Sequence, residues 1–262
     1  MGWLLKLWGW ISGWRVAAGP VTQAQVPPVG EAAVADIRFR AQICCHTGAV
    51  ASVHVAAPFL PGGDDTPLRL ALRHWLRWRK DGIEPPPLAF DLPATMAQSP
   101  DLVMPLLWEI DRQEFPTDRL IFAAPLDAGP VEDQWGLLLL ARFGCVIEAA
   151  RFDVSDLGAL RQLGPGMARL RLPHHALRDC HTRPGGGRML LSLLAMAQRF
   201  GLQTLACDVA SRDQHGFLAQ LGCDIVQGEA VAPVLDASGM AQFLHAMTEV
   251  QRPRIGIKRP AA

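Results

Sequence analysis

The sequence lacks an excess of charge of either sign. Its 262 residues include 25 Lys and Arg against 25 Asp and Glu, so the formal net charge is zero and the pI is near 7.1. Non-specific binding to nucleic acid depends on a basic surface that neutralises phosphates. We therefore expect no nucleic acid among the partners of this protein.

Long apolar runs and densely spaced cysteines are also missing. No apolar stretch reaches the roughly 18 to 20 residues that a transmembrane helix needs. The six cysteines are scattered in mostly apolar surroundings, unlike the dense pattern of a small secreted disulfide scaffold. These absences favour a cytoplasmic protein with reduced thiols. Half of the residues are apolar, which is enough for a full core in a chain of this length.

The first 30 residues differ from the rest of the chain. Half of the eight tryptophans lie within 14 residues there, and the only charges nearby are those of Lys6 and Arg15. Indoles beside a few cations are typical of a short helix in the headgroup layer of a membrane. We expect peripheral contact with the inner membrane through Trp3, Leu4, Leu7, Trp8, Trp10, Ile11 and Trp14. Docking on a protein partner or on the chain's own domain is the alternative.

Short strand-like runs alternate with longer helical ones over residues 31–250, between the tryptophan-rich segment with its linker (1–30) and a basic tail (251–262). The expected strands are 37–43, 49–56, 88–92, 119–123, 145–150, 167–172, 203–207 and 224–227. The expected helices are 68–80, 101–113, 135–143, 188–200, 212–221 and 237–249. Alternation predicts an α/β fold with a mostly parallel sheet, and eight strands are the number that closes a TIM-like (β/α)8 barrel. An open, doubly wound sheet is the alternative.

The functional mouth of such a barrel lies at the carboxyl ends of its strands. The residues expected there are Asp91, Ala123, Ala150, Arg151, Arg171, Cys207 and Gln227. One carboxylate, two guanidiniums, one thiol and one amide are a poor set for acid–base catalysis.

The C-terminal half contains the most specific pattern. The segment LGCDIVQGEAVAP (221–233), with Gln227, Gly228 and Pro233, follows a helix, strand and loop over 190–217, and similar patterns occur at 47–59 and 88–103. Over about residues 36–245 the chain resembles the EAL domain, a bacterial family of cyclic di-GMP phosphodiesterases and their inactive relatives.

The resemblance implies a two-metal hydrolysis of phosphodiesters, in which oxygen ligands hold the paired cations. The family's functional positions fall on His54, Pro58, Asp91, Ala123, Leu126, Ala150, Arg151, Arg171, Cys207 and Gln227. Only Gln227 matches the family, although Asp91 keeps an oxygen and Arg171 keeps a positive charge. A register slip that used Asp153 or Asp156 would restore at most one carboxylate.

This replacement of ligands indicates a pseudoenzyme with no catalytic residues, metal or cofactor. A methyl group binds no cation, and Arg151 would bring a permanent positive charge to the metal position. We therefore expect a protein-interaction or regulatory module in cyclic di-GMP-linked signalling, with a protein partner.

Two other functions stay open. A receptor that binds cyclic di-GMP without cutting it would use Arg40, Asp91, Arg151, Arg171, Gln227, Gly228 and Pro233. An active phosphodiesterase with an unusual metal is the less favoured alternative.

Three further patterns have ordinary explanations. His54 with Cys207, and the group His174, His175, Cys180 and His181, contain zinc-binding residue types but match no common zinc pattern, so we expect space-filling and a solvated loop. The three glycines at 185–187 suggest a flexible hinge. The basic residues of helix 68–80 suggest a solvated face.

Overall fold

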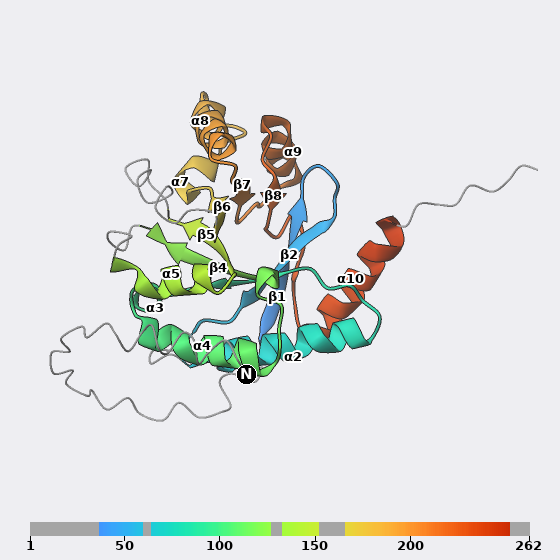
Figure 1. The fold of residues 1–262 in the computed structure, drawn as a ribbon. Helices are drawn as coiled ribbons and strands as arrows, with labels where there is room; N and C mark the ends of the chain where they lie inside the picture. Colours follow the sequence, from blue (N-terminus) through green and yellow to red (C-terminus); the bar gives the residue numbers. More distant parts are fainter. Residues whose placement is uncertain (1–36, 60–63, 127–132, 152–165, 252–262) are drawn as a thin grey trace, which may run out of the picture. The chain divides into compact units, whose positions relative to one another are not determined.

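The computed structural model describes residues 37–59, 64–126, 133–151 and 166–251 (Figure 1). The chain divides into a unit of residues 1–33 and a unit of residues 34–262. The tryptophan-rich segment, Asp153, Asp156 and the basic tail from residue 252 lie outside the described residues.

A closed barrel of eight strands forms the centre of the second unit. The strands are β1 (Arg38–Cys44), β2 (Val50–Ala56), β3 (Leu88–Asp91), β4 (Leu120–Pro125), β5 (Val146–Ala150), β6 (Met167–Arg171), β7 (Gln203–Ala206) and β8 (Ile225–Val226). The hydrogen-bonded order runs from β2 through β8 to β1, and β1 also pairs with β2. The barrel prediction is confirmed, and the open sheet is excluded.

Strand β1 runs against its neighbours, whereas β2 to β8 are parallel. Only five residues separate β1 from β2. A parallel crossover needs a dozen or more residues, so this short connection makes an antiparallel hairpin. A ninth strand, β9 (Val234–Leu235), also pairs with β1. It was not expected from the sequence.

The described helices are α2 (Thr66–Lys80), α3 (Ala94–Gln98), α4 (Pro100–Arg112), α5 (Trp135–Arg142), α7 (His174–Leu177), α8 (Gly186–Arg199), α9 (Arg212–Leu221) and α10 (Ala237–Gln251), with a 3₁₀ turn, η2 (Thr117–Arg119). The six long helices match the expected ones. The short α3 and α7 were not expected because four or five residues show no helical periodicity. Within the described residues, no helix is both long and apolar enough to cross a bilayer.

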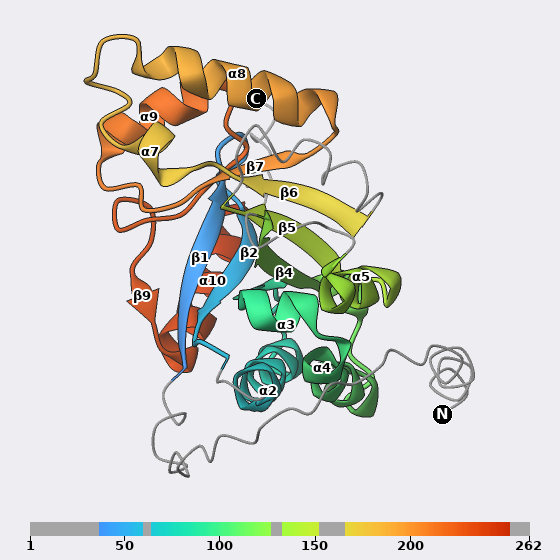
Figure 2. The same cartoon turned by 90° about the vertical axis from the view of Figure 1, so that its left-hand side faces the viewer.

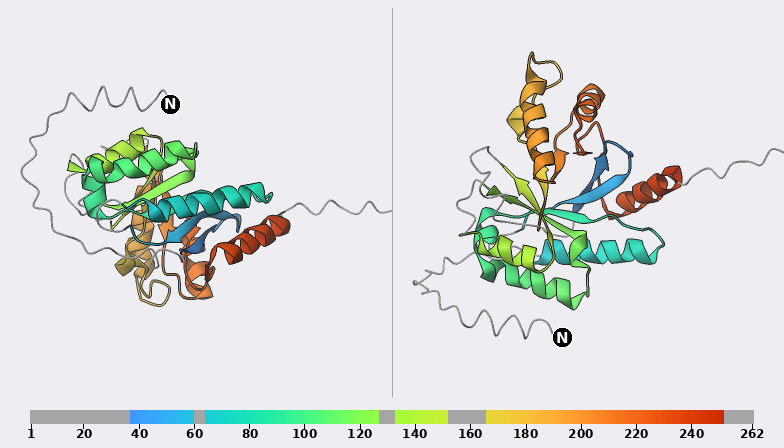
Figure 3. Two further views of the ribbon diagram at one scale, coloured as in Figure 1. Left: turned by 90° about the horizontal axis from the view of Figure 1, so that it is seen from below. Right: turned by 45° about the horizontal axis from the view of Figure 1, so that its top comes forward.

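The helices pack on the barrel in separate groups. Helices α3, α4 and α5 contact one another, and α8 lies beside α9 (Figures 1 and 3). Helix α10 packs against β1 and β9 (Figure 2). Since helices cover the outer face of the parallel strands, residues such as Leu88, Phe90 and Phe122 are buried, which explains the nearly continuous apolar strands.

Helix α2 has the solvated basic face that the sequence suggested. Arg73, Arg77 and Arg79 are exposed, whereas Trp75 and Trp78 are buried. Each indole N–H finds a carbonyl: Trp75 Nε1 donates to Pro86 O over 2.8 Å, and Trp78 Nε1 donates to Ala237 O over 3.1 Å. The buried face of the helix is thus explained by its indoles, and exposure to solvent explains the arginines on the other face.

The interpretation of the three glycines as a hinge is wrong. Gly185 has a φ of 75° and precedes α8, and Gly186 and Gly187 form its first turn. A Cβ on Gly186 would lie 2.5 Å from the carbonyl oxygen of Cys180. Close packing against the buried Cys180 explains this glycine. The expected solvated loop at 174–181 is likewise partly the helix α7.

Gly228 also serves close packing. It is buried after β8, and a Cβ there would lie 2.7 Å from the carbonyl carbon of Val209 and closer still to the nitrogen and oxygen of that residue. The Val209 N–H donates to Gln227 O over 3.0 Å, so the two segments cannot separate without losing hydrogen bonds.

We predict that Gly228→Ala lowers the free energy of unfolding by roughly 1–3 kcal/mol, because the added methyl overpacks a backbone contact. Urea denaturation followed by circular dichroism measures this change. The matched control is Gly216→Ala in α9, where a Cβ meets nothing within 4 Å. That variant should gain roughly 0.5–1 kcal/mol from helix propensity. Equal effects of the two substitutions would contradict the packing role of Gly228.

Candidate functional site

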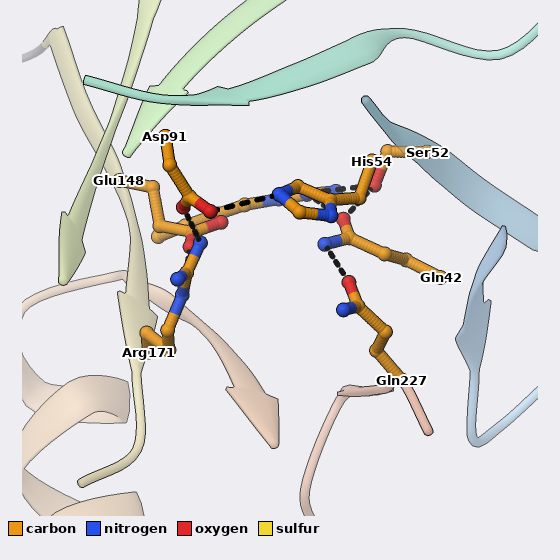
Figure 4. Close-up of polar contacts among 8 residues, drawn as sticks. Gln42, Ser52, His54, Asp91, Glu148, Arg171 and Gln227 are labelled. Carbon is orange, nitrogen blue, oxygen red and sulfur yellow. Dashed lines mark hydrogen bonds and ion pairs between the residues drawn. The ribbon is translucent and has the colours of Figure 1, made fainter. Parts of the chain in front are cut away.

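Four polar side chains meet at the mouth of the barrel: His54 of β2, Asp91 of β3, Glu148 of β5 and Arg171 of β6 (Figure 4). We call them the Arg171 cluster. Arg171 Nη2 lies 2.8 Å from Asp91 Oδ1, and Arg171 Nε lies 2.8 Å from Glu148 Oε1. His54 Nε2 lies 3.0 Å from Asp91 Oδ2. One guanidinium therefore joins two carboxylates.

The cluster extends from solvent into the barrel interior. The side chain of Asp91 is 55% exposed, that of Arg171 is 21% exposed and that of Glu148 is fully buried. The second oxygen of Glu148, Oε2, has no hydrogen-bond partner among the described residues. A buried carboxylate depends strongly on its counter-ion, so the bond from Arg171 is essential to this site.

The charges in the cluster stabilise one another. Burial by itself would raise the pKa of Asp91, but the hydrogen bond with His54 and the charge of Arg171 hold it well below its usual range. Burial alone would lower the pKa of Arg171, and the charge of Glu148 chiefly outweighs it, so the pKa is raised. Asp91 and Arg171 are thus ionised at neutral pH.

A second group of polar side chains lies in the barrel interior. Gln42 Nε2 donates to Gln227 Oε1 over 2.8 Å, and Ser52 Oγ donates to Gln42 Oε1. Arg169 Nη1 donates to Ser52 Oγ over 2.8 Å and to Gln42 Oε1 over 3.1 Å. We call Gln42, Ser52, Arg169 and Gln227 the interior network. All four side chains are buried.

Several residues expected at the mouth contribute no polar side chain. Ala123, Leu126 and Ala150 are buried apolar residues. Pro58 is exposed. Cys207 is half-buried, and burial raises the pKa of its thiol to about 12, although Arg171 opposes the shift. Ala123 and Ala150 therefore present methyl groups at positions where the resemblance implies acidic residues.

The residues expected to contact a nucleotide lie in different settings. Arg40 of β1 is half-buried and pairs in register with His54. Arg151 is exposed just after β5 and has a φ of 48°. Gln227 and Gly228 are buried, and Pro233 is exposed. The guanidinium that contacts both carboxylates of the cluster is that of Arg171.

Four residues of these two groups were not predicted from the sequence: Glu148, Gln42, Ser52 and Arg169. The resemblance directed attention to the strand ends, whereas these residues lie within strands. The available signal was a charged or amide side chain in an otherwise apolar strand, as in VIEAA of β5. Such residues are rarely buried without a partner, so each one predicts an interior contact.

A pair of divalent cations does not fit these residues. Among the described residues, no group of three or more His, Cys, Asp or Glu is placed to hold a metal ion. The two carboxylates of the cluster are already bound to a guanidinium. His174, His175, Cys180 and His181 form no such group in this part of the chain.

Comparison with known proteins decides the family. The EAL domain family matches residues 62–234. The chain belongs to the EAL domain family. No curated protein matches the chain by sequence.

Solved EAL domains share this fold at low sequence identity. The EAL domain of Mycobacterium smegmatis DcpA is 20% identical with a TM-score of 0.70, covering 80% of this chain and 96% of that one. The PaMucR phosphodiesterase in complex with c-di-GMP is 18% identical with a TM-score of 0.64, covering 78% and 93%. The Xanthomonas citri FimX EAL domain in complex with c-di-GMP is 16% identical with a TM-score of 0.64, covering 76% and 87%.

We predict that Arg171→Met lowers the free energy of unfolding of this EAL domain by about 3–5 kcal/mol, because Glu148 is left buried without its counter-ion. Chemical denaturation measures the change. The control is Arg77→Met, since Arg77 is 78% exposed and its ion pair with Asp81 spans 4.0 Å. It should change stability by less than about 0.5 kcal/mol.

The double variant Arg171→Met with Glu148→Gln should regain much of the loss, because no uncompensated charge remains. If the double variant is as unstable as the sum of the two single variants, the ion pair is not the source of the effect.

Proposed function

We propose that this EAL domain does not hydrolyse cyclic di-GMP and acts as a protein-interaction or regulatory module in cyclic di-GMP-linked signalling. The observation that carries the proposal is the bond of Arg171 to both Asp91 and Glu148. A permanent cation is already placed between the carboxylates of the mouth.

The chemistry of metal binding supports this proposal. Hard divalent cations need several anionic oxygens, and a guanidinium beside those oxygens repels a second cation. Ala123 and Ala150 supply only methyl groups at positions where the family carries acids. A water could replace one missing ligand, but it does not replace most of the set.

Exposed apolar side chains support a protein partner. The side chain of Trp108 on α4 is 57% exposed, and that of Trp135 on the adjacent α5 is 44% exposed. Tryptophans are frequent anchors of protein interfaces. The partner we propose is therefore a protein that contacts the outer face of the barrel.

A cyclic di-GMP receptor without hydrolytic activity is the second candidate. The complexes of PaMucR and of the FimX domain with c-di-GMP favour it. Arg40, Arg151 and Arg171 supply cations for two phosphates. Against it, the charge of Arg171 is offset by Asp91 and Glu148, and Gln227 is engaged with Gln42.

A titration with cyclic di-GMP, with and without Mg²⁺ or Mn²⁺, distinguishes these functions. We expect neither heat of binding at high micromolar nucleotide nor linear dinucleotide in the product analysis, while an active EAL phosphodiesterase in the same buffers gives both. Heat without product would favour the receptor. Product that disappears with a chelator would show that the chain is an active enzyme and would contradict the proposal.

We also propose that residues 3–14 hold the domain at the inner membrane surface. The support is the sequence pattern of tryptophan and leucine beside few cations. Deletion of residues 1–20 should move the protein from the membrane fraction to the supernatant after centrifugation, because the indoles are removed and the barrel is not. A truncated protein that stays with the membranes would contradict this role.

A further inference from the structure

Two cysteines face each other where the barrel closes. Strands β1 and β8 pair over only two positions, Ile43 with Val226 and Cys44 with Ile225. One residue further along, the Cys45 N–H donates to Asp224 O over 2.8 Å. Cys223 directly precedes Asp224. Cys45 and Cys223 are therefore within one residue of direct opposition across the β1–β8 seam.

The two thiols also shift each other's pKa. A hydrogen bond with Cys223 raises the pKa of Cys45, and the same bond lowers the pKa of Cys223. Thr204 Oγ1 lies 3.8 Å from Cys223 Sγ, and its hydroxyl donates to Asp224 Oδ2 over 2.8 Å. Cys45 is half-buried, whereas Cys223 is fully buried. One thiol of the pair is thus partly open to a small solute, and the other is enclosed by the protein.

We propose that Cys45 and Cys223 form an oxidative modification site, which a hydroperoxide converts to a disulfide across the β1–β8 seam. The sulfur of one cysteine of the pair, as its thiolate, bonds to one peroxide oxygen as the O–O bond breaks, and the first water leaves. The sulfur of the other cysteine then attacks it, the S–O bond breaks and the second water leaves. Two thiols lose two protons and two electrons, and one hydrogen peroxide becomes two waters.

The other cysteines lack this arrangement. Cys145 is buried, and burial raises the pKa of its thiol to about 12. Cys180 is buried near α8, and Cys207 lies beside Arg171. Within the described part of the chain, no second cysteine is among the groups that chiefly shift the pKa of these three thiols. We therefore expect peroxide to join Cys45 and Cys223 in preference to the other cysteines.

Cys44, the neighbour of Cys45 in the sequence, has a pKa shifted in the opposite direction to that of Cys45. Burial alone would raise the pKa of Cys44, but hydrogen bonds with Thr47 outweigh it, and the pKa is lowered. A neighbouring thiol with more thiolate character can attack the disulfide and begin its exchange with a free thiol. Reversible bonds of this kind are the ones that persist only transiently in a reducing cytoplasm.

The disulfide would fix the closure of the barrel. The seam also contains the Gln42–Gln227 hydrogen bond, and otherwise β8 contributes two residues to it. Nearly the whole barrel lies between Cys45 and Cys223, so the bond closes a very long loop in the unfolded chain. Oxidation should raise the melting temperature by on the order of 10 °C, and a reductant should reverse the change.

The test treats the full chain with hydrogen peroxide, quenches it, alkylates it under denaturing conditions and determines its mass. We expect two of the six thiols to escape alkylation in a monomer that is two hydrogen atoms lighter. Digestion should give the peptide of Cys44 and Cys45 joined to that of Cys223, with the alkyl group on Cys44.

Three variants and the unmutated chain keep the test decisive. Cys45→Ser and Cys223→Ser should abolish the joined peptide, whereas Cys145→Ser, which changes a buried cysteine far from the seam in sequence, should leave it intact. Six alkylated thiols after oxidation of the unmutated chain would overturn the proposal. A joined peptide in which Cys45 carries the alkyl group would also overturn the proposal. This result is obtained with the unmutated chain, so it does not depend on whether a variant folds.

Discussion

The bond between Arg171 and Glu148 is the constraint on which the barrel mouth depends. Glu148 is fully buried in β5, and an ionised carboxylate in that setting is tolerated only beside a cation. Arg171 supplies the cation from β6 and extends past it to Asp91 of β3, which in turn contacts His54 of β2. One guanidinium thereby links side chains from four of the eight strands. Its positive charge is balanced by carboxylates of the protein itself.

The interior network applies the same principle at the seam. Gln42 of β1 bonds to Gln227 after β8, and Ser52 of β2 links Gln42 to Arg169 of β6. The side chains in this network donate hydrogen bonds to and accept them from one another. Amides and a guanidinium can therefore be buried inside the barrel. Satisfied networks of this kind fix strand register, so barrel closure and the shape of the mouth are linked.

The sequence predicted the scaffold far better than the site. Alternation and helix length located all eight barrel strands and the six long helices, because those signals are local. The partners of Glu148 and Gln42 are not local: Glu148 meets a residue 23 positions away, and Gln42 meets one 185 positions away. A family comparison by position directed attention to Ala150 and Arg151 instead, since it compares residue types and not the cross-barrel contacts that a changed residue makes.

Packing alone explains two residues of the segment 221–233 that resembles the family, Gln227 and Gly228. Gln227 closes the seam through Gln42, and Gly228 has no room for a methyl against the backbone of Val209. Both would be selected for stability in a barrel that never met a nucleotide. Their presence is therefore no argument for nucleotide chemistry. At Ala123, Ala150 and Cys207, by contrast, the resemblance implies acidic residues, and the chain carries two methyl groups and a thiol.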